Sequence, residues 1–141
     1  MITFILGPSG SGKTSYMIDK ANKLMKAGNG NIVFIDSDDS QMFSLDHSVR
    51  LINAKQYGVK SVDRLYGFLA GIIARDYDCE MIFVDGIYDI IDLSEDLENL
   101  TNALLKLTDE NHVLLVLGLN RSKDEVPTQK GVDYVELAAN D

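Results

Sequence analysis

The residues with the clearest chemical potential form one octapeptide near the start of the chain. Residues 7–14 read Gly-Pro-Ser-Gly-Ser-Gly-Lys-Thr, which fits the pattern G-x-x-x-x-G-K-[ST] at every fixed position. In such a loop the glycines let the backbone turn its N–H groups inward around phosphate oxygens. Lys13 would reach the β- and γ-phosphates, and the Thr14 hydroxyl would ligate Mg²⁺. The sequence therefore predicts a nucleotide-binding loop that consists of Gly7, Pro8, Ser9, Gly10, Ser11, Gly12, Lys13, Thr14 and Ser15.

The sequence on both sides of this loop predicts the elements that position it. Residues 2–6 are apolar, apart from one threonine, and suit a short buried strand. After the loop, residues at helical spacing predict a helix that ends at Gly28, namely Tyr16, Met17, Ala21, Leu24 and Met25. The N-terminus of this helix would direct its dipole and its free N–H groups at the bound phosphates.

A carboxylate that follows a second apolar run completes the predicted metal site. Asp85 comes after residues 81–84, which are all apolar, and Gly86 follows it. Phosphate-loop proteins hold Mg²⁺ with such a strand-terminal carboxylate, usually through water. We therefore expect Thr14 and Asp85 to hold the metal ion, with helix capping or simple solvation of Asp85 as the competing interpretation.

A cluster of three further carboxylates follows the predicted strand at residues 31–35. It consists of Asp36, Asp38 and Asp39. The carboxyl ends of parallel strands open onto the ligand crevice, so these side chains should lie near the phosphates. Asp38, or with less support Asp36, would orient or deprotonate an attacking water. The cluster could instead cap a following helix or form a solvated acidic loop.

Cations that could stabilise a transferring phosphoryl group are few. The chain has four arginines, which are Arg50, Arg64, Arg75 and Arg121. Arg121 and Lys123 follow the apolar residues 113–119, at the edge of the sheet where the phosphates are expected. Arg121 is therefore a candidate catalytic residue, and a surface charge on a loop is the alternative.

Length and composition limit the classes of protein that this chain can belong to. Its 141 residues suit a single domain, 1–141, and its 45% hydrophobic content is ordinary for a globular protein. A net charge of −9 argues against a general affinity for nucleic acid. The single Cys79 excludes an internal disulfide and favours a cytoplasmic location. The longest apolar run, 113–119, is too short to span a membrane, so no membrane partner is expected.

Alternating strand and helix patterns predict an α/β fold with three layers. Such alternation implies a mostly parallel, five-stranded sheet with helices on both faces. The strands are expected at residues 2–6, 31–35, 81–85, 112–119 and 132–137. Ser61 and Ser94 are the expected N-caps of two helices. Residues 49–53 are a further candidate strand, which would give the sheet a sixth strand.

The order of these motifs resembles the RecA-like branch of phosphate-loop ATPases, which includes recombinases, DnaB-type helicases and clock-protein ATPases. The resemblance rests on the loop together with Phe34–Asp38, Phe83–Asp85 and Leu119–Arg121. It implies ATP and Mg²⁺ as cofactors and self-association into a homo-oligomer. It also matches residues 121–131 to a loop that contacts single-stranded DNA in recombinases. The catalytic residues that it implies are Lys13, Asp38 or Asp36, Asn120 as a polar sensor, and Arg121.

Three functions remain open at this stage. The chain looks like a minimal ATPase core, similar to compact versions encoded by phages and mobile elements, with slow hydrolysis because Asp38 replaces a longer glutamate. A small-molecule kinase of the shikimate or gluconate type would use Asp36 and Asp38, although the Arg-rich lid of such kinases is missing. A nucleotide-gated interaction module would bind ATP without useful turnover. No guanine-reading segment is visible, which favours ATP over GTP.

Overall fold

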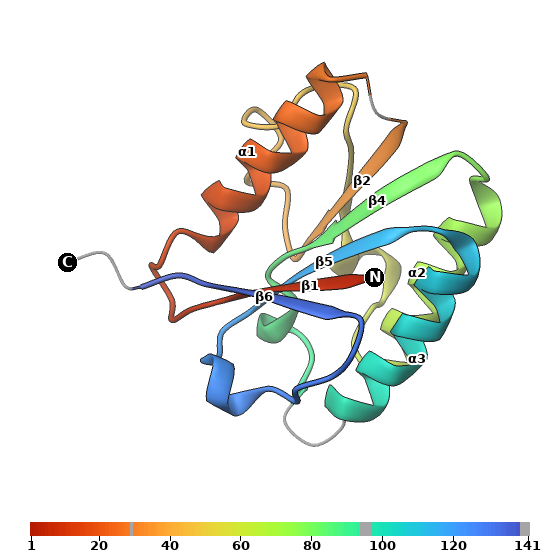
Figure 1. Cartoon of the computed structure of the whole chain (residues 1–141). Helices are drawn as coiled ribbons and strands as arrows, with labels where there is room; N and C mark the ends of the chain where they lie inside the picture. The colour runs from red at the N-terminus through yellow and green to blue at the C-terminus, as the bar shows by residue number, and fades with distance from the viewer. Residues whose placement is uncertain (29, 94–96, 139–141) are drawn as a thin grey trace.

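The strands of this chain form one sheet in which every neighbouring pair runs parallel (Figure 1). The computed structural model describes residues 1–28, 30–93 and 97–138, and in these ranges the sheet has six strands in the order β3-β2-β4-β5-β1-β6. Their bounds are β1 (Ile2–Leu6), β2 (Asn31–Asp36), β3 (Arg50–Asn53), β4 (Cys79–Val84), β5 (Leu114–Leu119) and β6 (Val132–Glu136).

The sheet has one strand more than the five predicted, because the optional segment forms the edge strand β3. This strand pairs with β2 in register from Val33↔Arg50 to Asp36↔Asn53. None of its four residues is fully buried. An edge strand with a single neighbour does not need the continuous apolar run of a strand covered on both faces, so its sequence signal is weak.

Three α-helices connect or follow the strands in the described part of the chain, namely α1 (Lys13–Lys26), α2 (Val62–Arg75) and α3 (Leu97–Asn111). Helix α2 begins at the predicted cap, because the Ser61 hydroxyl accepts a hydrogen bond from the Arg64 N–H at 3.2 Å. Ser94, the expected cap of α3, lies outside the described residues. None of the described helices is long and apolar enough to cross a membrane.

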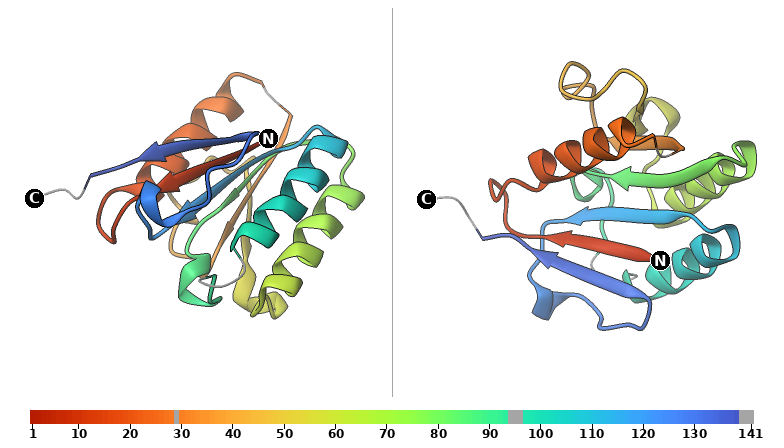
Figure 2. Two further views of the ribbon diagram at one scale, coloured as in Figure 1. Left: turned by 60° about the horizontal axis from the view of Figure 1, so that its bottom comes forward. Right: turned by 45° about the horizontal axis from the view of Figure 1, so that its top comes forward.

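Helix α1 packs against one set of sheet side chains, whereas α2 and α3 pack against another. Figure 2 shows α1 lying apart from the α2–α3 pair. Met17 and Ala21 of α1 join Ile5 of β1 in one buried cluster. Phe4 of β1 joins the second cluster, together with leucines of α2 and α3. Successive residues of a strand point to opposite faces, so β1 contributes to both clusters.

The candidate site residues lie at or after the carboxyl ends of strands, which a parallel sheet gathers at one edge. The loop follows β1, Asp36 ends β2, Asp85 follows β4 and Asn120 follows β5. Strand β5 lies between β1 and β4 in the sheet. Asn120 is therefore placed between the loop and Asp85.

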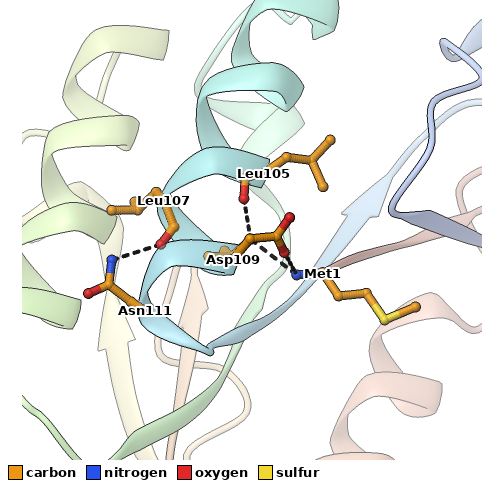
Figure 3. A network of polar contacts seen from close by, with 6 residues as sticks. Met1, Leu105, Leu107, Asp109 and Asn111 are labelled. Carbon is orange, nitrogen blue, oxygen red and sulfur yellow. Dashed lines mark hydrogen bonds and ion pairs between the residues drawn. The ribbon is translucent and has the colours of Figure 1, made fainter.

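The opposite edge of the sheet is fixed by the amino group of Met1 (Figure 3). This group donates to Asp109 Oδ1 at 2.6 Å and to Thr108 Oγ1 at 3.3 Å. The Thr108 hydroxyl in turn donates to the Leu105 carbonyl at 3.2 Å. The start of β1 is thus attached to the last turns of α3, far from the edge that carries the candidate residues.

Candidate functional site

The loop between β1 and α1 ends in a helix N-terminus without a side-chain cap. Gly12 is the N-cap residue and has φ 89°, a left-handed conformation that glycine adopts without strain. No side chain of the described residues caps this end. The first N–H groups of a helix have no acceptor within the helix, so here they are left to a ligand or to water.

The Lys13 side chain lies across the loop and is 4% exposed. Its ammonium donates hydrogen bonds to the Gly7 carbonyl at 2.8 Å and to the Pro8 carbonyl at 3.0 Å. The ring of Tyr88 lies 5.7 Å from the Lys13 Nζ. Burial lowers the pKa of Lys13, and the negative charge of Asp85 partly offsets this effect.

Thr14 and Asp85, the two predicted metal ligands, are in direct contact. The Thr14 hydroxyl donates to Asp85 Oδ2 at 2.5 Å, and Asp85 Oδ1 accepts from the Gly86 N–H at 2.9 Å. Burial raises the pKa of Asp85, while these two hydrogen bonds lower it. A hydroxyl beside a carboxylate is the kind of oxygen pair that Mg²⁺ uses when phosphate oxygens and waters supply its other ligands.

In the part of the chain that the structure describes, no larger cluster of metal-ligating side chains accompanies this pair. Among the described residues, no group of three or more His, Cys, Asp and Glu side chains is arranged to hold a metal ion. A cation at Thr14 and Asp85 would therefore depend on a ligand that brings its own oxygens, as a nucleoside triphosphate does.

The structure separates Asp36 from Asp38, two of the three carboxylates in the predicted cluster. Asp36 is buried, and its Oδ1 accepts from the Ser37 N–H at 2.7 Å. Burial, together with the charges of Asp85 and Asp38, raises the pKa of Asp36 to about 7. Asp38 is exposed and accepts from the Ser40 N–H at 2.9 Å, and its hydrogen bonds with Ser40 lower its pKa. Asp36 thus faces the interior near Asp85, whereas Asp38 closes a surface turn.

A tight turn at Gly86 brings the chain back toward the loop. Gly86 has φ 67°, and a Cβ at this position would lie 2.7 Å from Asp36 Oδ1 and from Ser37 Oγ. The following 3-10 helix, η2 (Ile87–Asp89), presents Tyr88 to the loop. Burial raises the pKa of Tyr88 to about 12.

Two cavities adjoin the loop, and a third shares residues with both of them. The first, of about 350 Å³, is lined by Ser9, Gly10, Gly12, Lys13, Thr14, Ser15 and Tyr88. The second, of about 540 Å³, lies between residues 7–9 of the loop and the end of β6. The third, of about 580 Å³, lies beside Tyr88. Asn120 and Arg121 line both the second and the third cavity, so the structure brings these two predicted residues to the edge of the loop.

The polar groups of the loop fit an anionic ligand. The Ser11 hydroxyl is buried and has no hydrogen-bond partner among the described residues, whereas buried polar groups almost always have one. It belongs to the same loop as the Lys13 ammonium and the uncapped start of α1. Free N–H groups, a buried cation and an unpartnered hydroxyl are the groups that a phosphate chain satisfies.

Tyr88 is the site residue that sequence reasoning missed. Gly86 directly after Asp85 is a signal for a sharp turn, and this signal is visible in the sequence. The direction of the Tyr88 side chain depends on how Gly86 packs against Asp36. The spacing of residues in the sequence does not indicate this packing.

Among solved structures, the chain is similar to the crystal structure of the RadB recombinase. The two have 14% identical residues and a TM-score of 0.54, and the match covers 84% of this chain and 60% of the RadB chain. At this identity the likeness shows the fold alone, and it is consistent with a RecA-like α/β domain. No protein-family model and no curated protein matches the sequence.

Proposed function

We propose that this chain binds ATP together with Mg²⁺ and hydrolyses it slowly. The observation that supports the proposal most directly is the 2.5 Å contact of Thr14 with Asp85 at the uncapped N-terminus of α1. The contact joins two oxygen ligands from segments 71 positions apart. Beside it lies a buried lysine whose ammonium donates to two loop carbonyls. The RecA-like fold of the RadB neighbour supports the same proposal.

Each part of the loop has a role in binding. The N–H groups of the loop and the Lys13 ammonium bind the phosphates, and Thr14 and Asp85 hold Mg²⁺. When bound, Mg²⁺ would neutralise phosphate charge that the nearby carboxylates otherwise repel.

Of the two candidate carboxylates, Asp36 is better supported as the group that orients the attacking water. It is buried near Asp85, and with a pKa of about 7 it can accept a proton at neutral pH. Asp38 is engaged by Ser40 at the surface. The same separation weakens the kinase alternative, which needs both carboxylates at the acceptor. Asn120 and Arg121 are proposed to contact the terminal phosphate from the end of β5.

Self-association and binding of single-stranded DNA have less support than nucleotide binding. Both follow from the RecA-like resemblance, in which a cation from a neighbouring subunit often completes the site. The net charge of −9 argues against DNA as a general ligand. The experiment below is therefore carried out both with and without DNA.

The test is nucleotide binding and phosphate release, measured for the wild type and for Lys13→Ala. Lys26→Ala is a matched control, because Lys26 is exposed at the far end of the same helix. We expect Mg-ATP binding and slow release that Lys13→Ala abolishes and Lys26→Ala keeps. Measurements with and without an oligothymidylate show whether DNA stimulates release. Binding without any release would favour the nucleotide-gated module, and equal binding by Lys13→Ala would refute the site.

A further inference from the structure

Tyr88 is the one residue lining the loop cavity that does not belong to residues 9–15, among the residues that the structure describes. It also lines the neighbouring cavity of about 580 Å³, which contains Asn120 and Arg121. Tyr88 therefore stands between the phosphate loop and the next space along the carboxyl edge of the sheet.

The position of this ring is fixed by the turn that carries it. The Asp89 N–H donates to the Gly86 carbonyl at 3.1 Å, and the Ile91 N–H donates to the Ile87 carbonyl at 2.9 Å. Ile87 is fully buried beneath the turn. Because Gly86 packs against Asp36 without room for a Cβ, the segment cannot shift toward β2. The internal hydrogen bonds, the buried Ile87 and the tight packing of Gly86 restrict the turn that carries Tyr88, whose ring lies beside the loop.

The ring of Tyr88 is the third protein contact of the Lys13 ammonium. Two of the contacts are hydrogen bonds to the Gly7 and Pro8 carbonyls, and the ring centroid lies 5.7 Å from Nζ. We propose that Tyr88 is a positioning residue, whose ring holds the Lys13 ammonium in the loop and thereby favours a nucleoside triphosphate over a diphosphate. This inference rests on the proposed nucleotide binding.

The preference follows from where the charges lie. Lys13 of such a loop reaches the β- and γ-phosphates, so its position matters most for a ligand that has a γ-phosphate. The ring attracts the ammonium through its quadrupole and keeps water from that side. Without the ring, water would screen the attraction between Lys13 and the phosphates, and the side chain could turn away. A triphosphate has more negative charge near Lys13 than a diphosphate has. It therefore loses more binding affinity when the ring is removed.

The test compares the dissociation constants of Mg-ATP and Mg-ADP by calorimetry in three variants. Tyr88→Leu removes the ring, Tyr88→Phe keeps the ring without the hydroxyl, and Tyr66→Leu removes a tyrosine of α2 that lines none of the three cavities. A lost cation–π contact predicts that Tyr88→Leu weakens ATP binding by about 2- to 30-fold, with a smaller effect on ADP. Tyr88→Phe and Tyr66→Leu should keep the wild-type ratio of ATP to ADP affinity.

Three results would overturn the inference. Equal weakening of ATP and ADP in Tyr88→Leu would mean that the ring only supports the fold of the turn. If Tyr88→Phe lowers the ratio of ATP to ADP affinity as much as Tyr88→Leu does, the effect belongs to the hydroxyl and not to the ring. No change in either variant would remove any role for the side chain, even while Lys13→Ala abolishes binding. A wild-type protein without Lys13-dependent nucleotide binding would instead refute the proposed function, and this inference with it.

Discussion

Replacing Asp36 with Asn should raise the free energy of unfolding at pH 8. The Asp36 side chain is 6% exposed, and burial is the largest cause of its elevated pKa. Asparagine has the same shape and keeps an oxygen that can accept from the Ser37 N–H. The substitution therefore removes a buried charge and leaves the packing and one hydrogen bond in place.

The direction of the pH dependence follows from the two pKa values. The pKa of Asp36 is about 7 in the folded protein and 3.8 as a free side chain. Between these values the folded state binds more protons than the unfolded state, so the free energy of unfolding falls as pH rises from about 4 to about 7. At about 1.36 kcal/mol for each pH unit, the full penalty above pH 7 has an upper limit of about 4 kcal/mol.

The assay is urea unfolding of the wild type and Asp36→Asn at pH 5 and at pH 8, without nucleotide or Mg²⁺. The variant should be more stable than the wild type at pH 8, by a difference that shrinks at pH 5. Asp38→Asn is the control, because the lowered pKa of this exposed carboxyl predicts no gain in stability at pH 8. A stability difference that is the same at both pH values, or a less stable Asp36→Asn at pH 8, would refute the reasoning.

Two further predictions concern the turn and the metal ion. Gly86→Ala should lower the free energy of unfolding by about 1–3 kcal/mol, because φ is 67° and the new Cβ would meet Asp36 Oδ1 at 2.7 Å. Thermal unfolding measures this, with Gly67→Ala in helix α2, where a Cβ meets nothing within 4 Å, as the control. Removal of Mg²⁺ with a chelator should weaken ATP binding to the wild type, and Asp85→Asn should reduce this dependence. ATP binding that calorimetry finds unchanged by the chelator would contradict the metal site.

The candidate site could be located in the sequence because its main part is one contiguous segment. The residues proposed to surround phosphates are close together in sequence, and the apolar runs at β1, β2, β4 and β5 mark central strands. The contact of Thr14 with Asp85 follows from strand ends that meet at one edge. Its role in holding Mg²⁺ stays a prediction.

The features that the sequence did not specify depend on packing between distant segments. Strand β3 has no fully buried residue, so its pattern does not separate it from a loop. The difference in burial between Asp36 and Asp38 follows from where β2 ends, because a shift of two positions separates a buried carboxylate from an exposed one. The ends of strands and helices are defined only to within one or two residues, so a sequence pattern does not place them more closely.

The pairing of β1 has a consequence for the order of events during synthesis. The strand that leads into the phosphate loop is bordered by β5 and β6, with Ile2 opposite both Leu115 and Val132. The loop is complete as a sequence once residue 15 has left the ribosome, yet the strand before it has no neighbour until the last third of the chain follows. A nascent chain that stops before β5 therefore carries the intact loop motif without the sheet needed to hold it, so the proposed nucleotide binding would come late in translation.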